Sequence, residues 1–207
     1  MTDDMLVSRE WLPIAALDGP SGVGKTTLLE GIADRLRRSA VRMELASNND
    51  SGRWRQVIRE LAGSPEHPLT LALSTASARA ELREAARGPV LCDRYVLSTL
   101  VYQRFAGISM DYLYVVNRPL LAGSVTFALR LEAEELAERR KSRAHKSDWF
   151  KDRLDVRREV EMYEEASTYL VQKGHDVRIV DASMDKVAIV EGLSVELASL
   201  WAKFRRS

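Results

Sequence analysis

The sequence predicts an α/β domain with a parallel sheet, and three observations lead to this prediction. Short apolar segments alternate with longer amphipathic segments along the chain, as when strands are joined by crossover helices. No internal repeat, low-complexity tract or Pro/Gly/Ser-rich linker divides the 207 residues. A glycine-rich loop joins the first apolar segment to the first amphipathic one. We therefore expect a single domain, residues 1–207, with one large core.

The individual elements follow from segment length and periodicity. Short apolar runs predict buried strands at Leu12–Leu17, Val41–Ala46, Pro89–Cys92, Val125–Leu131 and Val177–Val180. Longer amphipathic segments predict helices at Thr26–Arg38, Arg53–Leu61, Leu69–Arg87, Val96–Phe105, Ala133–Arg143 and Arg153–Lys173. The last of these helices carries many charges of alternating sign, which is typical of a solvated outer face. We expect most of its surface to be exposed.

Composition excludes several classes of protein. The 31 Lys and Arg residues nearly balance the 30 Asp and Glu residues, which argues against binding nucleic acid through bulk positive charge. A single cysteine, Cys92, excludes an intramolecular disulfide framework and a cysteine-based zinc site. The acidic N-terminal segment does not resemble a signal peptide, and no apolar run approaches membrane-spanning length. We expect a cytoplasmic protein with no nucleic-acid or membrane partner.

The loop after the first predicted strand reads Gly19-Pro-Ser-Gly-Val-Gly-Lys-Thr26, the G-x-x-x-x-G-K-T pattern of a phosphate-binding P-loop. Its glycines let several backbone N–H groups converge on one anion, at the positively polarised start of the next helix. Lys25 can neutralise the β- and γ-phosphates, and the Thr26 hydroxyl can bind Mg²⁺. A chance glycine-rich turn is the alternative. The position between a strand and a helix favours a nucleoside triphosphate site.

A second polar segment, Asp93-Arg-Tyr-Val-Leu-Ser-Thr-Leu-Val-Tyr-Gln103, follows the third predicted strand. Its first residues emerge at the carboxyl edge of the sheet, where doubly wound folds bind ligands. Asp93 can hold magnesium through water and Arg94 can bind a second phosphate group, whereas a local ion pair between them is the alternative. On the helix that follows, i, i+4 spacing gathers four polar side chains on one broad face: Ser98, Thr99, Tyr102 and Gln103.

These segments together resemble the thymidylate kinase family of P-loop nucleoside monophosphate kinases. Residues 93–103 match the family's DRY…S…YQ pattern, and residues 58–73 resemble the segment that leads to its acceptor-site helix. Residues 129–143 are similar to its fourth strand and arginine-rich lid, and residues 177–183 to its last strand and adenine-side loop. The resemblance extends from about Leu12 to about Leu197.

The resemblance implies a P-loop kinase fold, with a five-stranded parallel sheet, helices on both faces and a short basic lid at about residues 139–152. It also implies a homodimer. The helix Val96–Phe105 is a candidate for the dimer interface, but an apolar helix face looks the same when it packs inside one chain.

The resemblance also implies a reaction. ATP donates its γ-phosphoryl group to a nucleoside monophosphate, dTMP or a related pyrimidine nucleotide, with Mg²⁺ as cofactor. The acceptor is already an anion, so catalysis requires positioning and charge neutralisation rather than a strong base. The P-loop has no basic residue besides Lys25, so a transition-state arginine is expected from the lid. Arg139 and Arg143 would share a helix face there, although a solvent-facing basic helix end is the alternative.

Roles for individual residues follow from the same resemblance. The implied catalytic residues are Lys25, Arg94, Arg139 and Arg143. ATP is expected to contact Gly19, Ser21, Gly22, Val23, Gly24, Lys25, Thr26, Thr27, Asp181 and Ala182. The acceptor nucleotide is expected to contact Asp18, Arg53, Thr75, Arg79, Arg94, Ser98, Thr99, Tyr102 and Gln103. Magnesium is expected at Thr26 and Asp93.

The sequence departs from the family pattern around the acceptor. Ser21 stands where an acid is usual, Thr75 stands where a base-stacking aromatic is expected, and residues 47–53 replace an arginine-proline-glycine segment. Trp54 could supply the ring, although a core or surface tryptophan is the alternative. These departures leave two other functions open: a kinase of a modified nucleotide, nucleoside or other small molecule, and a nucleotide-binding regulator without turnover. The intact phosphate-site residues favour an enzyme.

Overall fold

The structure, a computed structural model, describes residues 11–47, 52–63, 66–141 and 153–204. Its strands are β1 (Ile14–Asp18), β2 (Glu44–Ser47), β3 (Val90–Asp93), β4 (Ser124–Arg130) and β5 (Asp176–Asp181). They form one sheet in the order β2-β3-β1-β4-β5, and every neighbouring pair is parallel. The predicted α/β fold with a five-stranded parallel sheet is therefore confirmed.

The helices account for the amphipathic segments. They are α1 (Lys25–Arg38), α2 (Trp54–Ala62), α3 (Pro68–Ala85), α4 (Val96–Phe105), α5 (Met110–Asn117), α6 (Ala133–Lys141), α8 (Val156–Gln172) and α9 (Lys186–Phe204), with a 3₁₀ turn at Arg118–Leu121. The sequence patterns do not predict α5 or α9. Helix α5 is short, and α9 exposes Val187 and Val195 although it buries Ile189 and Leu193, so no single apolar stripe marks it.

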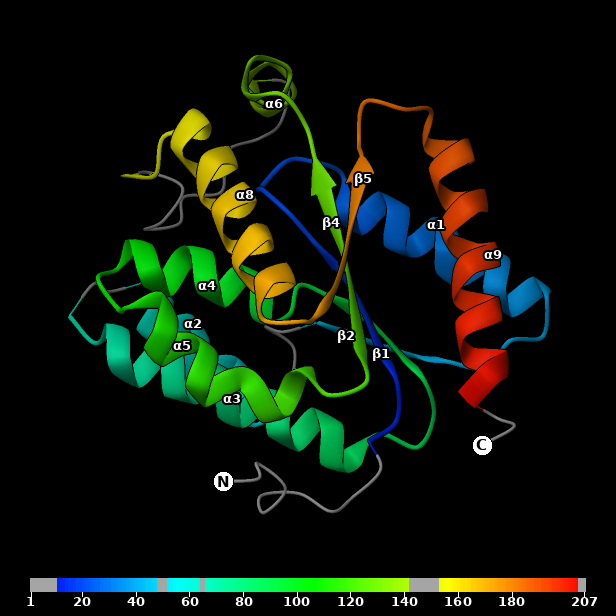
Figure 1. Cartoon of the computed structure of the whole chain (residues 1–207), viewed down its shortest axis with the longest axis horizontal. Helices are drawn as coiled ribbons and strands as arrows, with labels where there is room; N and C mark the ends of the chain where they lie inside the picture. The colour runs from blue at the N-terminus through cyan, green and yellow to red at the C-terminus, as the bar shows by residue number, and fades with distance from the viewer. Residues whose placement is uncertain (1–10, 48–51, 64–65, 142–152, 205–207) are drawn as a thin grey trace.

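Helices cover both faces of the sheet (Figure 1): α1 and α9 lie on one side, and α3, α4, α5 and α8 lie on the other. Successive side chains of β1 point to opposite faces of the sheet, as they do in any strand. Ile14 and Ala16 lie in one core, and Ala15 and Leu17 lie in the other. Gly31 allows α1 and α9 to approach closely, since a Cβ there would lie 2.9 Å from Val190 Cγ2. Two packed cores thus hold the central strands rigidly.

The edge strands correct one prediction. Strands β1, β3 and β4 are buried as expected, but β2 and β5 lie at the two edges of the sheet, where Leu45 is 43% exposed and Ile179 is 58% exposed. The prediction of buried strands is wrong for these two segments. An edge strand has a neighbour on one side only, and an apolar run alone does not distinguish it from a central strand.

Helix α4, the candidate for a dimer interface, lies inside the chain. Most of its residues are buried, and it packs against α3, α5 and α8. Its apolar face therefore serves the core of one chain. None of the helices in the described ranges is long and apolar enough to cross a membrane.

Candidate active site

The P-loop joins β1 to α1 at the carboxyl edge of the sheet. Gly22 and Gly24 have φ values of 88° and 111°, a region that residues with a Cβ rarely enter. Lys25 is buried, and its ammonium donates to the Gly19 and Pro20 carbonyls at 2.8 and 2.7 Å. Burial lowers the pKa of Lys25 well below its usual value, and the charge of Arg94 lowers it further. An anion brought into the loop would stabilise the charged form.

Asp18 organises the residues around this loop. The side chain is fully buried, and it accepts from the backbone N–H groups of Gly19, Tyr95 and Ser98 at 3.1, 2.9 and 3.1 Å, as well as from the Ser98 hydroxyl. Four donors match the acceptor capacity of a carboxylate. Asp18 therefore fixes the turn after β3 against the P-loop, and its predicted contact with the acceptor stays a prediction.

Arg94 sits on that turn in a strained conformation. Its φ is 64°, which is uncommon for a residue other than glycine and is found at functional sites. Its guanidinium donates to the Gly19 carbonyl at 3.2 Å and to the hydroxyls of Ser98, Tyr102 and Tyr163 at 3.0, 3.2 and 2.9 Å. The guanidinium also lies 5.2 Å from the centre of the Tyr102 ring. It thus lies beside the start of the P-loop.

Two groups at this edge suit a hard cation. Asp93 ends β3, and its Oδ1 is buried with no hydrogen-bond partner among the described residues. Thr26 is exposed in the first turn of α1, beside Lys25. Across the described ranges, no three His, Cys, Asp or Glu side chains gather as a metal site. Magnesium that bridges nucleotide phosphates needs only one or two protein ligands, so these residues fit it.

Helix α6 brings two arginines to the P-loop. Arg139 donates to the carbonyls of Val23 and Ala182 at 3.3 and 3.1 Å. Arg140, which the sequence analysis does not select, donates through Nε to the Ser21 carbonyl at 2.8 Å. A Cβ on Gly22 would lie 3.0 Å from Arg140 Cγ, so the arginine stem crosses the loop directly.

The rest of the predicted lid, residues 142–152 with Arg143, lies outside the described residues. The pairing of Arg139 with Arg143 on one helix face therefore stays a prediction.

Helix α8 supplies two further residues that the sequence analysis does not select. Glu159 is buried, accepts from the Ser21 N–H at 2.8 Å and from the Tyr102 hydroxyl at 2.7 Å, and pairs with Arg140. Tyr163 is buried and reaches Arg94 and Ser98. This helix, expected to be mostly solvated, buries one face, which carries Glu159, Met162, Tyr163, Ala166, Ser167 and Leu170. These positions recur at helical spacing, so the apolar stripe in the sequence is a signal that points to Glu159.

The predicted acceptor residue Arg79 is deeply buried, with 1% of its surface exposed. Its guanidinium donates to the Asn117 side chain, the Tyr95 carbonyl and the Thr99 hydroxyl at 2.9, 3.1 and 2.6 Å. Its Nε is buried, and no residue in the described part of the chain accepts from it. Burial lowers the pKa of Arg79 to about 10. In this arrangement Arg79 and Thr99 support the turn that carries Tyr95, and their contact with the acceptor stays a prediction.

Other acceptor candidates surround α3. Thr75 is buried, and its hydroxyl donates to the Ala72 carbonyl at 2.9 Å. Arg53 pairs with Glu81 of α3 at 3.0 Å, and the Trp54 indole donates to the same carboxylate at 2.6 Å. Gln103 Oε1 is buried, and none of the residues that the structure describes donates to it. The structure therefore places Trp54 beside α3, and its role as a stacking ring stays a prediction.

The adenine-side candidates lie at the end of β5. Asp181 accepts from the N–H and hydroxyl of Ser183 at 2.9 and 2.7 Å. The Ala182 N–H donates to the Arg130 carbonyl at 2.8 Å, and its own carbonyl accepts from Arg139. Helix α6 therefore connects this loop to the P-loop.

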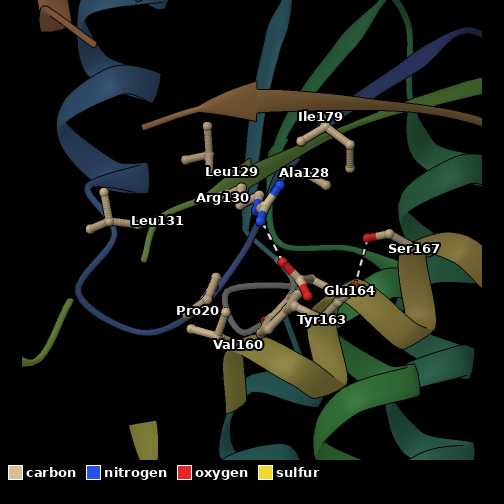
Figure 2. Close-up of a pocket in the computed structure, with 10 residues that line it drawn as sticks. All are labelled: Pro20, Ala128, Leu129, Arg130, Leu131, Val160, Tyr163, Glu164, Ser167 and Ile179. Atoms are coloured by element: carbon tan, nitrogen blue, oxygen red, sulfur yellow. Dashed lines mark hydrogen bonds and ion pairs between the residues drawn. The ribbon is translucent and has the colours of Figure 1, made fainter. Parts of the chain in front are cut away.

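Behind the P-loop, a cavity of about 30 Å³ separates Pro20 from β4, β5 and α8 (Figure 2). Arg130 and Glu164 pair across it at 3.0 Å, and the Ser167 hydroxyl donates to the Tyr163 carbonyl at 2.7 Å. A cavity of this size holds about one water molecule, far less than a nucleotide needs.

Comparisons with known proteins agree with this geometry. The family model of thymidylate kinase matches residues 17–191. The thymidylate kinase of Bacillus licheniformis is 32% identical over 191 residues, which cover 80% of this chain and 85% of that protein. The thymidylate kinase of Thermomicrobium roseum is 31% identical over 204 residues, covering 92% and 96%. The probable thymidylate kinase of Pyrococcus abyssi is 29% identical over 198 residues, covering 89% and 93%. This chain therefore belongs to the thymidylate kinase family of ATP-dependent nucleotide kinases.

Proposed function

We propose that the chain transfers the γ-phosphoryl group of ATP to dTMP, giving ADP and dTDP. One observation carries the proposal: Lys25 and Arg94 donate to the same carbonyl, that of Gly19, at 2.8 and 3.2 Å. Lys25 belongs to the donor side and Arg94 to the acceptor side. Two cations that converge on one atom hold two phosphates next to each other, which is what direct transfer requires.

Each cationic group of the site is assigned to a different phosphate. Lys25 and the P-loop N–H groups bind the β- and γ-phosphates, and Arg94 binds the acceptor phosphate. Arg139, within reach of the Val23 carbonyl, neutralises charge that develops on the transferred group. Such preorganised cations act without moving during the reaction, which is the main source of catalysis in phosphoryl transfer.

We also propose magnesium as the cofactor. The orphaned Oδ1 of Asp93 and the exposed hydroxyl of Thr26 would hold it, and Asp93 would act through water. When bound, the ion would neutralise negative charge on the β- and γ-phosphate oxygens.

Among the acceptors left open by the sequence, dTMP is favoured because the relatives that match most of the chain are thymidylate kinases.

We further propose a cytoplasmic homodimer. Leu69 and Leu73 are exposed one turn apart on α3, and an apolar pair of this kind suits a subunit interface. Light scattering of the wild type and of Leu73→Glu tests the dimer, which the variant should weaken.

The acceptor is tested by measuring ADP release from Mg-ATP with each common nucleoside monophosphate and nucleoside. The proposal expects the highest kcat/KM with dTMP. A higher value with a nucleoside or a non-pyrimidine monophosphate would overturn the choice of acceptor. No release with any of them would overturn the assignment as a nucleotide kinase.

A further inference from the structure

Glu159 closes a ring of contacts that the kinase motifs do not explain. Its Oε1 accepts from the Ser21 N–H at 2.8 Å, and its Oε2 accepts from Arg140. Arg140 in turn donates through Nε to the Ser21 carbonyl at 2.8 Å. Three segments far apart in the sequence, the P-loop, α6 and α8, thus meet at one residue of the loop.

The ion pair between Arg140 of α6 and Glu159 of α8 is far more buried than the Arg157–Glu134 pair between the same helices. The Glu159 side chain is 2% exposed and that of Arg140 is 21% exposed, whereas both partners in the Arg157–Glu134 pair are largely exposed. Exposed pairs contribute little because water and salt screen them. A buried pair whose remaining atoms are hydrogen-bonded fixes geometry, and removal of one partner leaves the other charge uncompensated.

A second set of hydrogen bonds, through the Tyr102 hydroxyl, connects Glu159 to Arg94 on the proposed acceptor side. The Tyr102 hydroxyl donates to Glu159 at 2.7 Å and accepts from Arg94 at 3.2 Å. Burial raises the pKa of Tyr102, so this hydroxyl keeps its proton and remains a donor to the carboxylate. Glu159 therefore lies between the guanidinium groups of Arg94 and Arg140.

The placement of Arg140 leaves it ready to bind a phosphate. Its stem crosses Gly22, where a Cβ would lie 3.0 Å from Arg140 Cγ. With its neighbours in the described part of the chain, Arg140 uses Nε and one terminal nitrogen. The second terminal nitrogen is left for a ligand above the loop.

From these contacts we propose that Glu159 is a positioning residue for phosphoryl transfer, which holds Arg140 above Gly22 so that its guanidinium meets the transferred group. The inference rests on the proposed kinase function. Glu159 itself touches no reacting atom. It acts by fixing a long, flexible arginine before substrate arrives, which removes an entropic cost from the transition state.

The test compares Glu159→Gln with Glu161→Gln, a matched change at an exposed site of the same helix, and measures kcat and KM for ATP and dTMP. We expect Glu159→Gln to lower kcat roughly 10- to 100-fold, the size of effect that a misplaced group produces, with KM for ATP within about twofold. Both variants should melt cooperatively, because Gln keeps the shape of Glu and can still accept from the Ser21 N–H.

A double-mutant cycle with Arg140→Met decides whether Glu159 acts through Arg140. If it does, Glu159→Gln should lower the kcat of the Arg140→Met protein by no more than about twofold. A full additional loss in that background would overturn the proposal and assign Glu159 a role of its own. A kcat for Glu159→Gln equal to that of Glu161→Gln would also overturn it.

Hydrogen exchange provides a readout that does not depend on the acceptor. The backbone amides of α6 should exchange faster in Glu159→Gln than in Glu161→Gln, while those of α9 should not change. If the wild type fails to phosphorylate dTMP, the proposed function fails, yet faster exchange in α6 would still support the hold on Arg140. Unchanged exchange in α6 would overturn the proposal that Glu159 positions Arg140, whichever acceptor the enzyme uses.

Discussion

Lys25 is buried, so its charged form is costly unless an anion is present. Lys25→Ala should therefore lower kcat by at least ~10²-fold, as loss of one preorganised charge does, without lowering the melting temperature of the free protein. The increase in melting temperature on addition of Mg-ATP should shrink or vanish, because binding to the native state produces it. Differential scanning fluorimetry and a turnover assay check both results. Normal turnover by the folded variant would remove Lys25 from the mechanism.

Arg79 is predicted to be needed for folding. Arg79→Met should lower the free energy of unfolding by at least ~1–3 kcal/mol, because buried acceptors on Asn117, Tyr95 and Thr99 lose their donor. Urea denaturation measures this, with Arg38→Met as a control at an exposed position of α1. If Arg79→Met kept wild-type stability and only raised the KM for dTMP, Arg79 would instead be the acceptor-binding residue that the family resemblance implies.

Among the individual site residues, the sequence predicts those of the P-loop and of the Asp93–Arg94 turn. Both are recognised by residues that are adjacent in the sequence. The sequence does not predict Glu159, Arg140 or Tyr163. Their partners lie far away in sequence; Ser21 and Glu159, for example, are 138 positions apart. The periodicity of helix α8 does place Glu159 on the same face as Met162, Tyr163, Ala166 and Leu170. It shows only that this carboxylate faces the core, and not that it meets Ser21, Tyr102 and Arg140.

Helix α6 is the element that should act mainly in the transition state. Arg139→Ala is expected to lower kcat more than it raises KM for ATP, because Arg139 reaches the P-loop through the Val23 carbonyl and neutralises charge that forms during transfer. Lys141→Ala, on the same helix but highly exposed, is the control. Steady-state kinetics separate the two constants. A change in KM alone for Arg139→Ala would contradict the role.

The packing of α5 against the start of β5 should give stability a dependence on pH. Burial lowers the pKa of His175 from 6.5, and its Nε2 lies 3.3 Å from the Tyr114 hydroxyl. The unfolded chain then binds more protons, so this contribution to stability is lost as the pH falls below about 6.5 toward the lower folded pKa.

This dependence is measured by thermal melting between about pH 5 and 7.5. His175→Gln should lose less stability than the wild type as the pH falls, while His67→Gln, exposed at the start of α3, should behave like the wild type. Identical pH profiles for His175→Gln and the wild type would show that His175 does not contribute.

For the elements, the sequence predicts every strand and six of the helices, because apolar runs and amphipathic periods are local properties. It misjudges the burial of β2 and β5, since sheet order decides which strands are edges. It misses α9, whose apolar residues on several faces pack against α1 through Gly31 and Val190. Such close packing depends on tertiary contact rather than on a pattern within the helix.

Across the whole molecule, the sheet brings the ends of β1, β3 and β5 to one edge, and α6 and α8 approach that edge from the other segments. Lys25, Arg94 and the Arg140–Glu159 pair all reach the short segment Gly19–Ser21. The residues proposed to bind the donor and the acceptor, together with one arginine of the predicted lid, thus meet around three consecutive residues. This convergence is what the family resemblance alone does not establish.

The central claim is that the chain transfers a phosphoryl group from ATP to dTMP and that Lys25 of the P-loop is needed for the transfer. Its most direct test is chromatographic detection of the products from Mg-ATP and dTMP, with wild type and Lys25→Ala in parallel. The account predicts ADP and dTDP in equal amounts from the wild type, and a rate at least ~10²-fold lower from the variant. Absence of dTDP from a folded wild-type protein, or equal rates from the two proteins, would contradict it.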